Sequence, residues 1–193
     1  VIPGKGVEFN DLELELREPT DRRAFALASA FEMGMTVAET QRLTGIDSWF
    51  LDRVKRITDL GAKLREQKGR ELNAEFLLEL KKSGFCDQQI ADFSGHSVEG
   101  VRKARLSAGI RPYIKQIDTL AAEYPAVTNY LYLTYNGSED DVDFNSENSV
   151  LVLGCGAYRI GSSVEFDWCC VNTVKTLRDL GYPTIMLNCN PET

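Results

Sequence analysis

The sequence has no long apolar run and few of the residues that build metal or disulfide sites. No stretch of about 18 consecutive apolar residues occurs, so we expect no membrane-spanning segment. The single histidine, His96, sits in a Gly-His-Ser turn, which leaves no Ser/His/Asp or Cys/His constellation to assemble. The five cysteines are odd in number and contain no C-x-x-C pair, so neither a disulfide framework nor a zinc site is indicated. We expect buried free thiols.

What is present is typical of a soluble globular protein. The chain has 193 residues, of which 43% are hydrophobic and 26% charged, enough for one ordinary domain plus a fragment of another. Its net charge of −7 argues against nucleic acid as a partner. The chain begins at Val1, without a start methionine or signal-peptide pattern, and stops at Thr193 directly after an apolar run. We therefore expect both ends to lie within a longer polypeptide.

Helix signals begin after a mostly charged segment, residues 1–19, which we interpret as an N-terminal connecting segment. Thr20 or Asp21 can cap a helix that ends at Gly34, with three apolar side chains on one face: Phe25, Ala28 and Phe31. Thr36-x-x-Glu39 predicts a capping box at the start of a short helix that ends at Gly45. Asp47 caps a longer helix whose apolar residues have helical spacing: Phe50, Val54, Ile57 and Leu64.

A second round of the same signals follows. Asn73 caps a helix that stops at Ser83-Gly84, a short helix ends at Gly95, and Ser97 caps a third. The two rounds superpose at a spacing of 50 residues: Gly34 with Gly84, Gly45 with Gly95, and Asp47 with Ser97. We predict a duplicated helix–short helix–helix unit whose copies pack together, in an all-α domain over residues 20–136.

From Pro112 the sequence becomes aromatic and less periodic, although we assign residues up to 136 to the helical domain. Residues 137–149 hold five acidic side chains and no basic one, which predicts a flexible acidic linker. Residues 150–193 then give an apolar strand, a Gly-rich loop, a helix near residues 166–180 and a second strand over residues 184–188. The right-handed crossover rule makes these two strands parallel neighbours, in a β-loop-α-β unit too small to form a stable sheet by itself. The expected fold is therefore mostly α with a truncated β-loop-α-β unit.

Three functional alternatives are weaker than a structural role. The Gly-rich loop has Arg159 where the dinucleotide fingerprint needs its third glycine, and no P-loop motif occurs. The helix opened by Ser97 resembles a recognition helix with Arg102, Lys103 and Arg105 exposed, but residues 20–135 carry nearly balanced charge. The parallel helix opened by Asp47 is moreover expected to bury Trp49 and Phe50. Glu165 and Asp167 could form an acid/base pair. A carboxylate at a helix start can also cap the helix and interact favourably with its dipole, and this role fits at least one of the two better.

Several segments carry a resemblance to one family. Residues 154–169, Gly-Cys-Gly-Ala-Tyr-Arg-Ile-Gly-Ser-Ser-Val-Glu-Phe-Asp-Trp-Cys, resemble the opening of the second synthetase half of carbamoyl phosphate synthetases, in the version found in eukaryotes. Residues 185–193 are similar to the next strand of that half, and residues 115–124 and 130–135 to the segment that precedes it. Ile46 to Leu51 is similar to the family's helical oligomerisation domain.

The resemblance implies a parent enzyme that makes carbamoyl phosphate from bicarbonate, glutamine-derived ammonia and two ATP, for pyrimidine or for arginine and urea synthesis. It implies ATP and Mg²⁺ for that parent, with K⁺ as a further ion, and none of them in this chain, because both ATP-grasp domains and the glutaminase lie outside it. The chain would then be a catalytically inactive connecting and oligomerisation piece, partnered by the remaining domains and by itself. The alternative is a helix-turn-helix-like nucleic-acid-binding or general protein-interaction module.

The resemblance also implies a site and a compartment. In the family, carbamate passes through an internal tunnel, and six loop residues match positions at or near its wall: Gly156, Arg159, Ile160, Gly161, Ser162 and Ser163. The expected compartment is the cytoplasm, with the mitochondrial matrix as the alternative.

Overall fold

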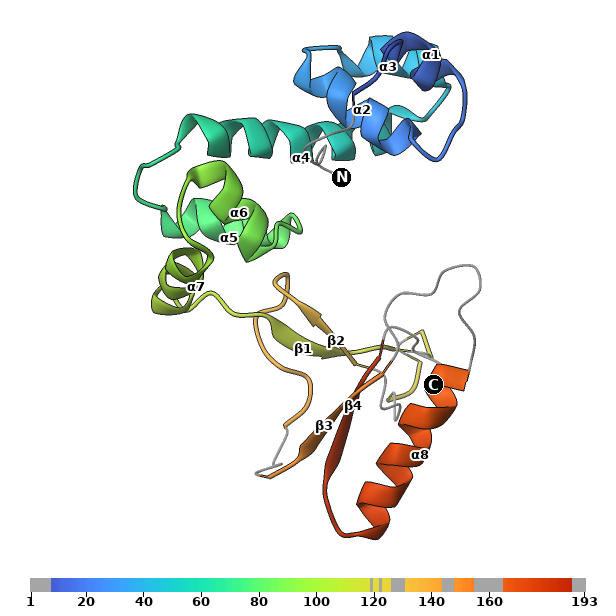
Figure 1. Cartoon of the computed structure of the whole chain (residues 1–193), viewed down its shortest axis with the longest axis vertical. Coiled ribbons are helices and arrows are strands. Elements are labelled where there is room, and N and C mark those ends of the chain that lie inside the picture. Colours follow the sequence, from blue (N-terminus) through green and yellow to red (C-terminus); the bar gives the residue numbers. More distant parts are fainter. Residues whose placement is uncertain are drawn as a thin grey trace. The chain divides into compact units, whose positions relative to one another are not determined.

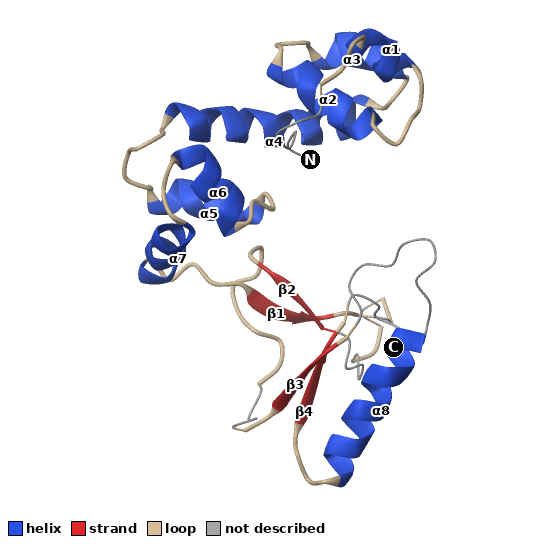
Figure 2. Cartoon of the chain, in the orientation of Figure 1, coloured by secondary structure: helices blue, strands red, loops and turns tan. Residues whose placement is uncertain are grey.

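A computed structural model of the chain describes residues 8–118, 120–121, 123–125, 131–143, 148–154 and 165–188 (Figure 1). The chain divides into two compact units, Val1–Pro112 and Tyr113–Thr193. In the part described, the first unit is helical and the second holds the strands (Figure 2). This confirms the expected fold class, mostly α with a few short strands in its C-terminal part.

The helical unit contains the predicted duplication. The first copy consists of α2 (Arg23–Glu32), α3 (Val37–Thr44) and α4 (Ser48–Glu66). The second copy consists of α5 (Ala74–Lys82), α6 (Asp87–Ser94) and α7 (Val98–Ser107). The turn glycines match in backbone conformation, because Gly34 and Gly84 have φ of 90° and 93° and Gly45 and Gly95 have φ of 69° and 75°. These left-handed values end each helix at low steric cost only for glycine.

Side-chain caps set most of the helix starts. Asp47, Asn73 and Ser97 accept hydrogen bonds from backbone N–H groups in the first turns of α4, α5 and α7. At α3 the Thr36 hydroxyl accepts from the Glu39 N–H while the Glu39 carboxylate accepts from the Thr36 N–H, which confirms the predicted capping box. The equivalent box at α6 is built by Cys86 and Gln89, with the thiol in place of the hydroxyl.

The start of α2 differs from the prediction. The N-cap residue is Arg22, and its side chain makes no capping hydrogen bond. Thr20, two residues before the N-cap, instead accepts from the N–H of Arg22 itself at 3.2 Å. The Arg23 guanidinium secures this helix start, because it donates to the carbonyl oxygens of Leu16 and Thr44 at 2.6 Å and 2.9 Å.

The segment predicted as an N-terminal connection contains a helix, α1 (Leu12–Arg17), capped by Asp11. Leu16 of this helix is fully buried in the first core cluster. Its partners in that cluster come from α2 and α4: Ala26, Leu27, Ala30, Phe31 and Leu51. Residues 12–17 are therefore part of the helical unit, not a connection to it.

The long helix α4 joins the two copies. It packs against α2 and α3 of the first copy and against α6 of the second. Gly61 lies where an added Cβ would stand 3.5 Å from the Phe93 ring, so the two copies approach closely there. The second core gathers apolar side chains from α5, α6, α7 and the turn after α5: Phe76, Leu77, Leu80, Phe85, Ile90 and Val101.

Two aromatic side chains at the start of α4 contradict the prediction that they are buried. Trp49 is 57% exposed and Phe50 is 60% exposed. The buried residue of this turn is Leu51, because it is the one that faces α2 and the core cluster. Helical spacing alone could not tell whether the face with Trp49 and Phe50 or the face with Leu51 packs against the core.

The second unit begins with strands inside the predicted all-α range. β1 (Tyr113–Gln116) pairs antiparallel with β2 (Leu131–Thr134), in a register that places Tyr113 opposite Thr134. The predicted helical domain extended to residue 136, whereas the helical unit of the structure ends at Pro112. Short strands separated by a long connection give too weak a local pattern to predict.

Residues 137–143, predicted as a solvated linker, lie along the other edge of β1. The Ile114 N–H donates to Asp140 Oδ1 at 2.7 Å, and the Gln116 N–H donates to Asp141 Oδ2 at 2.9 Å. The Asp141 N–H donates to the Ile114 carbonyl, and the Lys115 ammonium forms an ion pair with the Asp141 carboxylate. The Lys115 hydrogen bond and charge, with the Gln116 N–H, hold the pKa of Asp141 below its ordinary value. The acidic run thus protects a strand edge that would otherwise expose backbone donors.

The predicted β-loop-α-β unit is confirmed in its described parts. β3 (Val150–Leu153) pairs in parallel with β4 (Thr184–Leu187), and α8 (Glu165–Asp179) connects them. Gly181 takes a φ of 85° after the helix, as its predicted stop. Val152 is buried, and α8 packs against both strands. Three side chains of the other sheet face are more than half exposed: Leu151, Leu153 and Leu187.

Candidate functional site

The predicted site residues lie outside the described part of the chain. Gly156, Arg159, Ile160, Gly161, Ser162 and Ser163 all fall within residues 155–164. The structure describes the segments on either side of them, β3 up to Gly154 and the first turn of α8. Both flanking segments contact the carboxyl end of β4. This junction is the described part of the candidate site.

Gly154 and Asn188 stand side by side at the carboxyl ends of β3 and β4. A Cβ added to Gly154 would lie 2.8 Å from Asn188 Oδ1 and 3.0 Å from Asn188 Cβ, so only glycine permits this approach. The Gly154 N–H also donates to the Leu187 carbonyl at 2.8 Å, which continues the parallel ladder past the end of β3. The loop of the predicted site therefore leaves β3 from a fixed position beside Asn188.

Asp167 ties the first turn of α8 to the same place. The residue is only 7% exposed, and its carboxylate accepts a hydrogen bond from Asn188 Nδ2 at 2.9 Å. A carboxylate near a helix N-terminus is also favoured by the helix dipole, the role predicted for at least one member of the Glu165 and Asp167 pair. Sequence reasoning missed Asn188 as a member of this junction. Its only signal is a polar residue that ends an apolar strand.

A second polar cluster lies in the helical unit. Asp87, in the first turn of α6, accepts from the Lys81 ammonium at 2.7 Å through Oδ1 and from the Arg105 guanidinium at 3.1 Å through Oδ2. The Lys81 and Arg105 side chains are only 7% and 11% exposed. Burial alone would raise the pKa of Asp87, but the hydrogen bonds and charges of the two cations outweigh it and leave that pKa below its ordinary value.

The Asp87 cluster works as a structural link. It joins the end of α5, the start of α6 and the body of α7, and Arg105 also donates to the Ile110 carbonyl at 3.0 Å. Arg105 was predicted to lie exposed on a recognition helix, and its engagement with Asp87 contradicts that. The helix-turn-helix alternative thus loses Arg105 from its basic face, and no feature of the described residues supports nucleic-acid binding.

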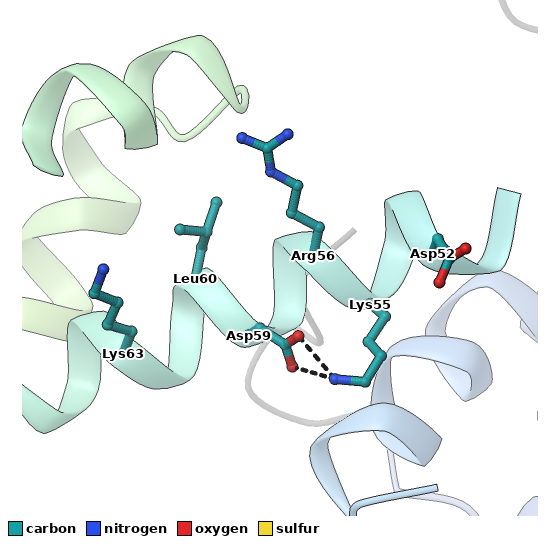
Figure 3. A pocket seen from close by; sticks show the side chains of 6 residues that line it. All are labelled: Asp52, Lys55, Arg56, Asp59, Leu60 and Lys63. Carbon is teal, nitrogen blue, oxygen red and sulfur yellow. Dashed lines mark hydrogen bonds and ion pairs between the residues drawn. The ribbon is translucent and has the colours of Figure 1, made fainter. Parts of the chain in front are cut away.

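A shallow hollow on α4 also gathers several ionisable groups. Figure 3 shows its lining: Asp52, Lys55, Arg56, Asp59, Leu60 and Lys63. The Lys55 ammonium donates to both Asp59 oxygens at 2.7 Å, as the dashed lines mark, and Arg56 lies 3.6 Å from a Glu79 carboxylate oxygen. Lys63 stands 4.6 Å from the centre of the Phe76 ring. Such pairs are typical of a solvated helix face.

The cysteines and possible metal ligands add no reactive site in the described residues. Cys86 and Cys169 are exposed and Cys170 is half-buried, which contradicts the prediction of buried thiols. Cys155 and Cys189 lie outside the described ranges. Across those ranges no three His, Cys, Asp or Glu side chains gather as a metal site, and no helix is long and apolar enough to cross a membrane.

Comparison with known proteins gives two matches in the order of the two structural units. Residues 3–109 match the oligomerisation domain of the carbamoyl-phosphate synthetase large chain, and residues 146–193 match the carbamoyl phosphate synthase preATP-grasp domain. The first match covers more than half of the chain and coincides with the helical unit.

Individual relatives agree with these matches. The chain is 50% identical over 94% of its length to the multifunctional protein pyrABCN of Emericella nidulans and 50% identical over 95% to the mitochondrial carbamoyl-phosphate synthase (ammonia) of Mus musculus. The corresponding Homo sapiens enzyme is 49% identical over 95% of the chain. The chain spans only 8% to 12% of the length of these relatives. It therefore belongs to the carbamoyl-phosphate synthetase large-chain family, as an oligomerisation domain followed by a preATP-grasp segment.

Proposed function

We propose that this chain is a connecting and assembly piece of a carbamoyl phosphate synthetase and catalyses no step by itself. The observation that carries the proposal is the order of its parts, a duplicated helical oligomerisation domain followed by the β3-α8-β4 unit of a preATP-grasp domain. The two polar clusters described above, around Asp87 and around Asp167, support it, because each joins neighbouring elements of the fold.

The chemistry then belongs to the rest of the parent protein. We propose that other domains supply the ATP and Mg²⁺ sites, with K⁺ as a further ion, and the glutaminase, and that the parent makes carbamoyl phosphate from bicarbonate, glutamine-derived ammonia and two ATP. Gly156 and residues 159–163 are proposed to line the passage of carbamate. Their order in the chain supports this, because they follow Gly154, which lies at the carboxyl end of β3, and ligands of parallel sheets are commonly bound at that edge. The proposed compartment is the cytoplasm, with the mitochondrial matrix as the alternative.

Self-association is the activity proposed for the chain itself. Parallel strands are normally covered on both faces, and Leu151, Leu153 and Leu187 leave one face of the β3–β4 pair open in this chain. The helical unit also exposes large apolar side chains, Trp49 and Phe50 among them. Exposed apolar surface of this kind commonly marks an interaction site.

Two measurements on the purified chain test the proposal. ATP hydrolysis with bicarbonate present, and carbamoyl phosphate formation, should not exceed those of a mock preparation. Sedimentation equilibrium at micromolar concentration should give a mass well above the 21.6 kDa of one chain. Bicarbonate-stimulated ATP turnover by the pure chain would refute the non-catalytic role, and a monomer at all concentrations would refute assembly.

A further inference from the structure

One exposed serine stands directly before the acidic residues that lie along β1. Ser138 is followed without interruption by Glu139, Asp140 and Asp141. The structure places Ser138 in an irregular surface segment after β2, and the residue is exposed. A hydroxyl in such a segment is accessible to an enzyme that modifies side chains, because surface loops carry most of the residues that other molecules reach.

The pattern around Ser138 does not recur in the chain. No other serine or threonine has acidic residues at all three of the positions that follow it. Thr36 has an acidic residue at the third position only, and its hydroxyl is engaged in the capping box. Thr176 lies within α8 and is followed by a basic residue, Arg178. Three consecutive carboxylates after an exposed hydroxyl suit a protein kinase whose substrate groove is basic.

Lys115 of β1 lies beside the residues on both sides of Ser138. Its Cδ is 3.4 Å from the position that a Cβ on Gly137 would take, and its ammonium donates to the Glu139 carbonyl at 3.5 Å. The same ammonium forms the ion pair with the Asp141 carboxylate. A phosphate on Ser138 would therefore be added next to a cation that already serves a carboxylate.

The cover of the β1 edge is made largely by charged side chains. The Asp140 and Asp141 carboxylates accept from the N–H groups of Ile114 and Gln116, and the Asp141 N–H adds a backbone bond to the Ile114 carbonyl at 2.9 Å. New negative charge nearby repels carboxylates and competes for their cation. This edge contact is therefore sensitive to phosphorylation in a way that a purely backbone ladder is not.

We propose that Ser138 is the phosphate acceptor of an acid-directed protein serine kinase, and that the phosphate loosens the carboxylate cover of β1. In the transfer, the bond between the γ-phosphorus of ATP and the oxygen that bridges it to the β-phosphate breaks. A new bond joins that phosphorus to Ser138 Oγ, the hydroxyl proton passes to the catalytic carboxylate of the kinase, and ADP leaves. The proposal does not depend on the proposed assembly role of the chain.

The expected effect on β1 follows from charge. The phosphate carries about −1.5 to −2 at pH 7 and stands within three residues of Glu139, Asp140 and Asp141. It repels these carboxylates, and it competes with Asp141 for the Lys115 ammonium. Both effects weaken the hydrogen bonds that the two aspartates accept from β1.

A kinase assay on the full chain tests the site. The chain is incubated with a purified acid-directed serine kinase and ATP labelled in its γ-phosphate, and mass spectrometry of peptides locates the phosphate. We expect the wild type to be labelled at Ser138 and Ser138→Ala to lose the label. Glu139→Lys should slow the initial rate about 10-fold or more, because it reverses the charge next to the serine.

The matched control is Glu71→Lys, which makes the same charge change at an exposed loop residue of the helical unit. This variant should be phosphorylated at the rate of the wild type. Equal rates for Glu139→Lys and Glu71→Lys, or a phosphate on another residue in place of Ser138, would overturn the assignment of the site. A wild-type chain that takes up no phosphate would overturn the whole proposal and leave self-association as it stands.

Residue-resolved hydrogen exchange tests the effect on β1. In the phosphorylated chain, amide exchange at Ile114 and Gln116 should be about 10-fold faster than in the unphosphorylated chain, because their acceptors are drawn away. Exchange at Leu80, in the core of the helical unit, should be unchanged. Equal exchange at both strand amides in the two forms of the chain would overturn the proposed loosening.

Discussion

Thr36 and Cys86 stand 50 residues apart and begin their helices in nearly the same conformation, with φ −80° and ψ 158° at Thr36 and φ −79° and ψ 160° at Cys86. Each accepts a hydrogen bond from the backbone N–H three residues on, Thr36 through oxygen at 3.2 Å and Cys86 through sulfur at 3.4 Å. The copies therefore share a capping geometry and differ in the acceptor atom, and sulfur is the weaker acceptor.

Cys86→Thr should stabilise the helical unit by about 0.5–1 kcal/mol, because it installs the better cap in a geometry already suited to it. Urea denaturation followed by circular dichroism measures the change. The reciprocal substitution, Thr36→Cys, should destabilise by a similar amount. A shift in the same direction for both substitutions would show that the acceptor atom is not the cause.

Asp87→Asn should destabilise the helical unit by about 2–3 kcal/mol, because it leaves the two poorly exposed cations Lys81 and Arg105 without their carboxylate. Asp92→Asn on the exposed side of the same helix is the matched control and should change stability by less than about 0.5 kcal/mol. Denaturant unfolding of the two variants and the wild type at neutral pH makes the comparison. Equal losses of stability at the two positions would mean that the ion pairs of Asp87 stabilise the fold no more than an exposed carboxylate does.

The same cluster predicts how stability depends on pH. Because the folded pKa of Asp87 is lowered, its contribution is fully present above the ordinary aspartate pKa of about 4 and is lost as pH falls through the lower folded value. The stability difference between wild type and Asp87→Asn should therefore shrink progressively in acid below about pH 4. A difference that stays constant, or grows, down to about pH 2 would contradict this linkage.

Gly154→Ala should destabilise the β3–β4 unit by about 1–2 kcal/mol, because the new methyl group would stand 2.8 Å from Asn188 Oδ1 and displace the Asn188 side chain from Asp167. Asn188→Ala removes the Oδ1 and Cγ atoms from this contact and leaves only the Cβ, 3.0 Å away. The double variant should therefore lose about 1 kcal/mol less stability than the sum of the two single losses. Thermal unfolding of the wild type, the two single variants and the double variant measures this difference. Strict additivity would mean that the two residues do not meet as described.

Features set by a few neighbouring residues could be predicted from the sequence. The Thr36 and Glu39 capping box, the Asp47, Asn73 and Ser97 caps and the left-handed Gly45 and Gly95 are each fixed within about four residues. Their recurrence every 50 residues is what revealed the duplication. The parallel pairing of β3 and β4 followed from the handedness of one crossover.

Features that depend on residues distant in the sequence could not be predicted. In the sequence, Asp140 and Asp141 belong to an acidic run that is typical of a solvated linker. In the structure, their carboxylates accept hydrogen bonds from N–H groups of β1, which lies some 25 residues earlier in the chain. Trp49 and Phe50 have the spacing of core residues, but α2 packs on the face that carries Leu51. Leu16 sits in a charged stretch and becomes a core residue only because Ala26 and Phe31 cover it. For the candidate site, sequence alone named the loop, whereas Gly154, Asp167 and Asn188 came together only in the fold.

The edge of β1 gives a prediction for hydrogen exchange. Asp140→Ala together with Asp141→Ala should speed amide exchange at Ile114 and Gln116, because both N–H groups donate to these carboxylates. Exchange at the buried core of the helical unit, for example at Leu80, should be unchanged. The comparison uses residue-resolved exchange measured by nuclear magnetic resonance. Continued protection of both strand amides in the variant would mean that other acceptors hold this edge.

The central claim is that the helical unit assembles the parent enzyme, and sedimentation equilibrium of a chain ending at Pro112 tests it most directly. That shortened chain keeps the whole duplicated unit and removes the four strands of the described residues. We predict that it self-associates at micromolar concentration with the same stoichiometry as the full chain. A shortened chain that remains a monomer at hundreds of micromolar, while the full chain associates, would place the contact in residues 113–193 and contradict the account.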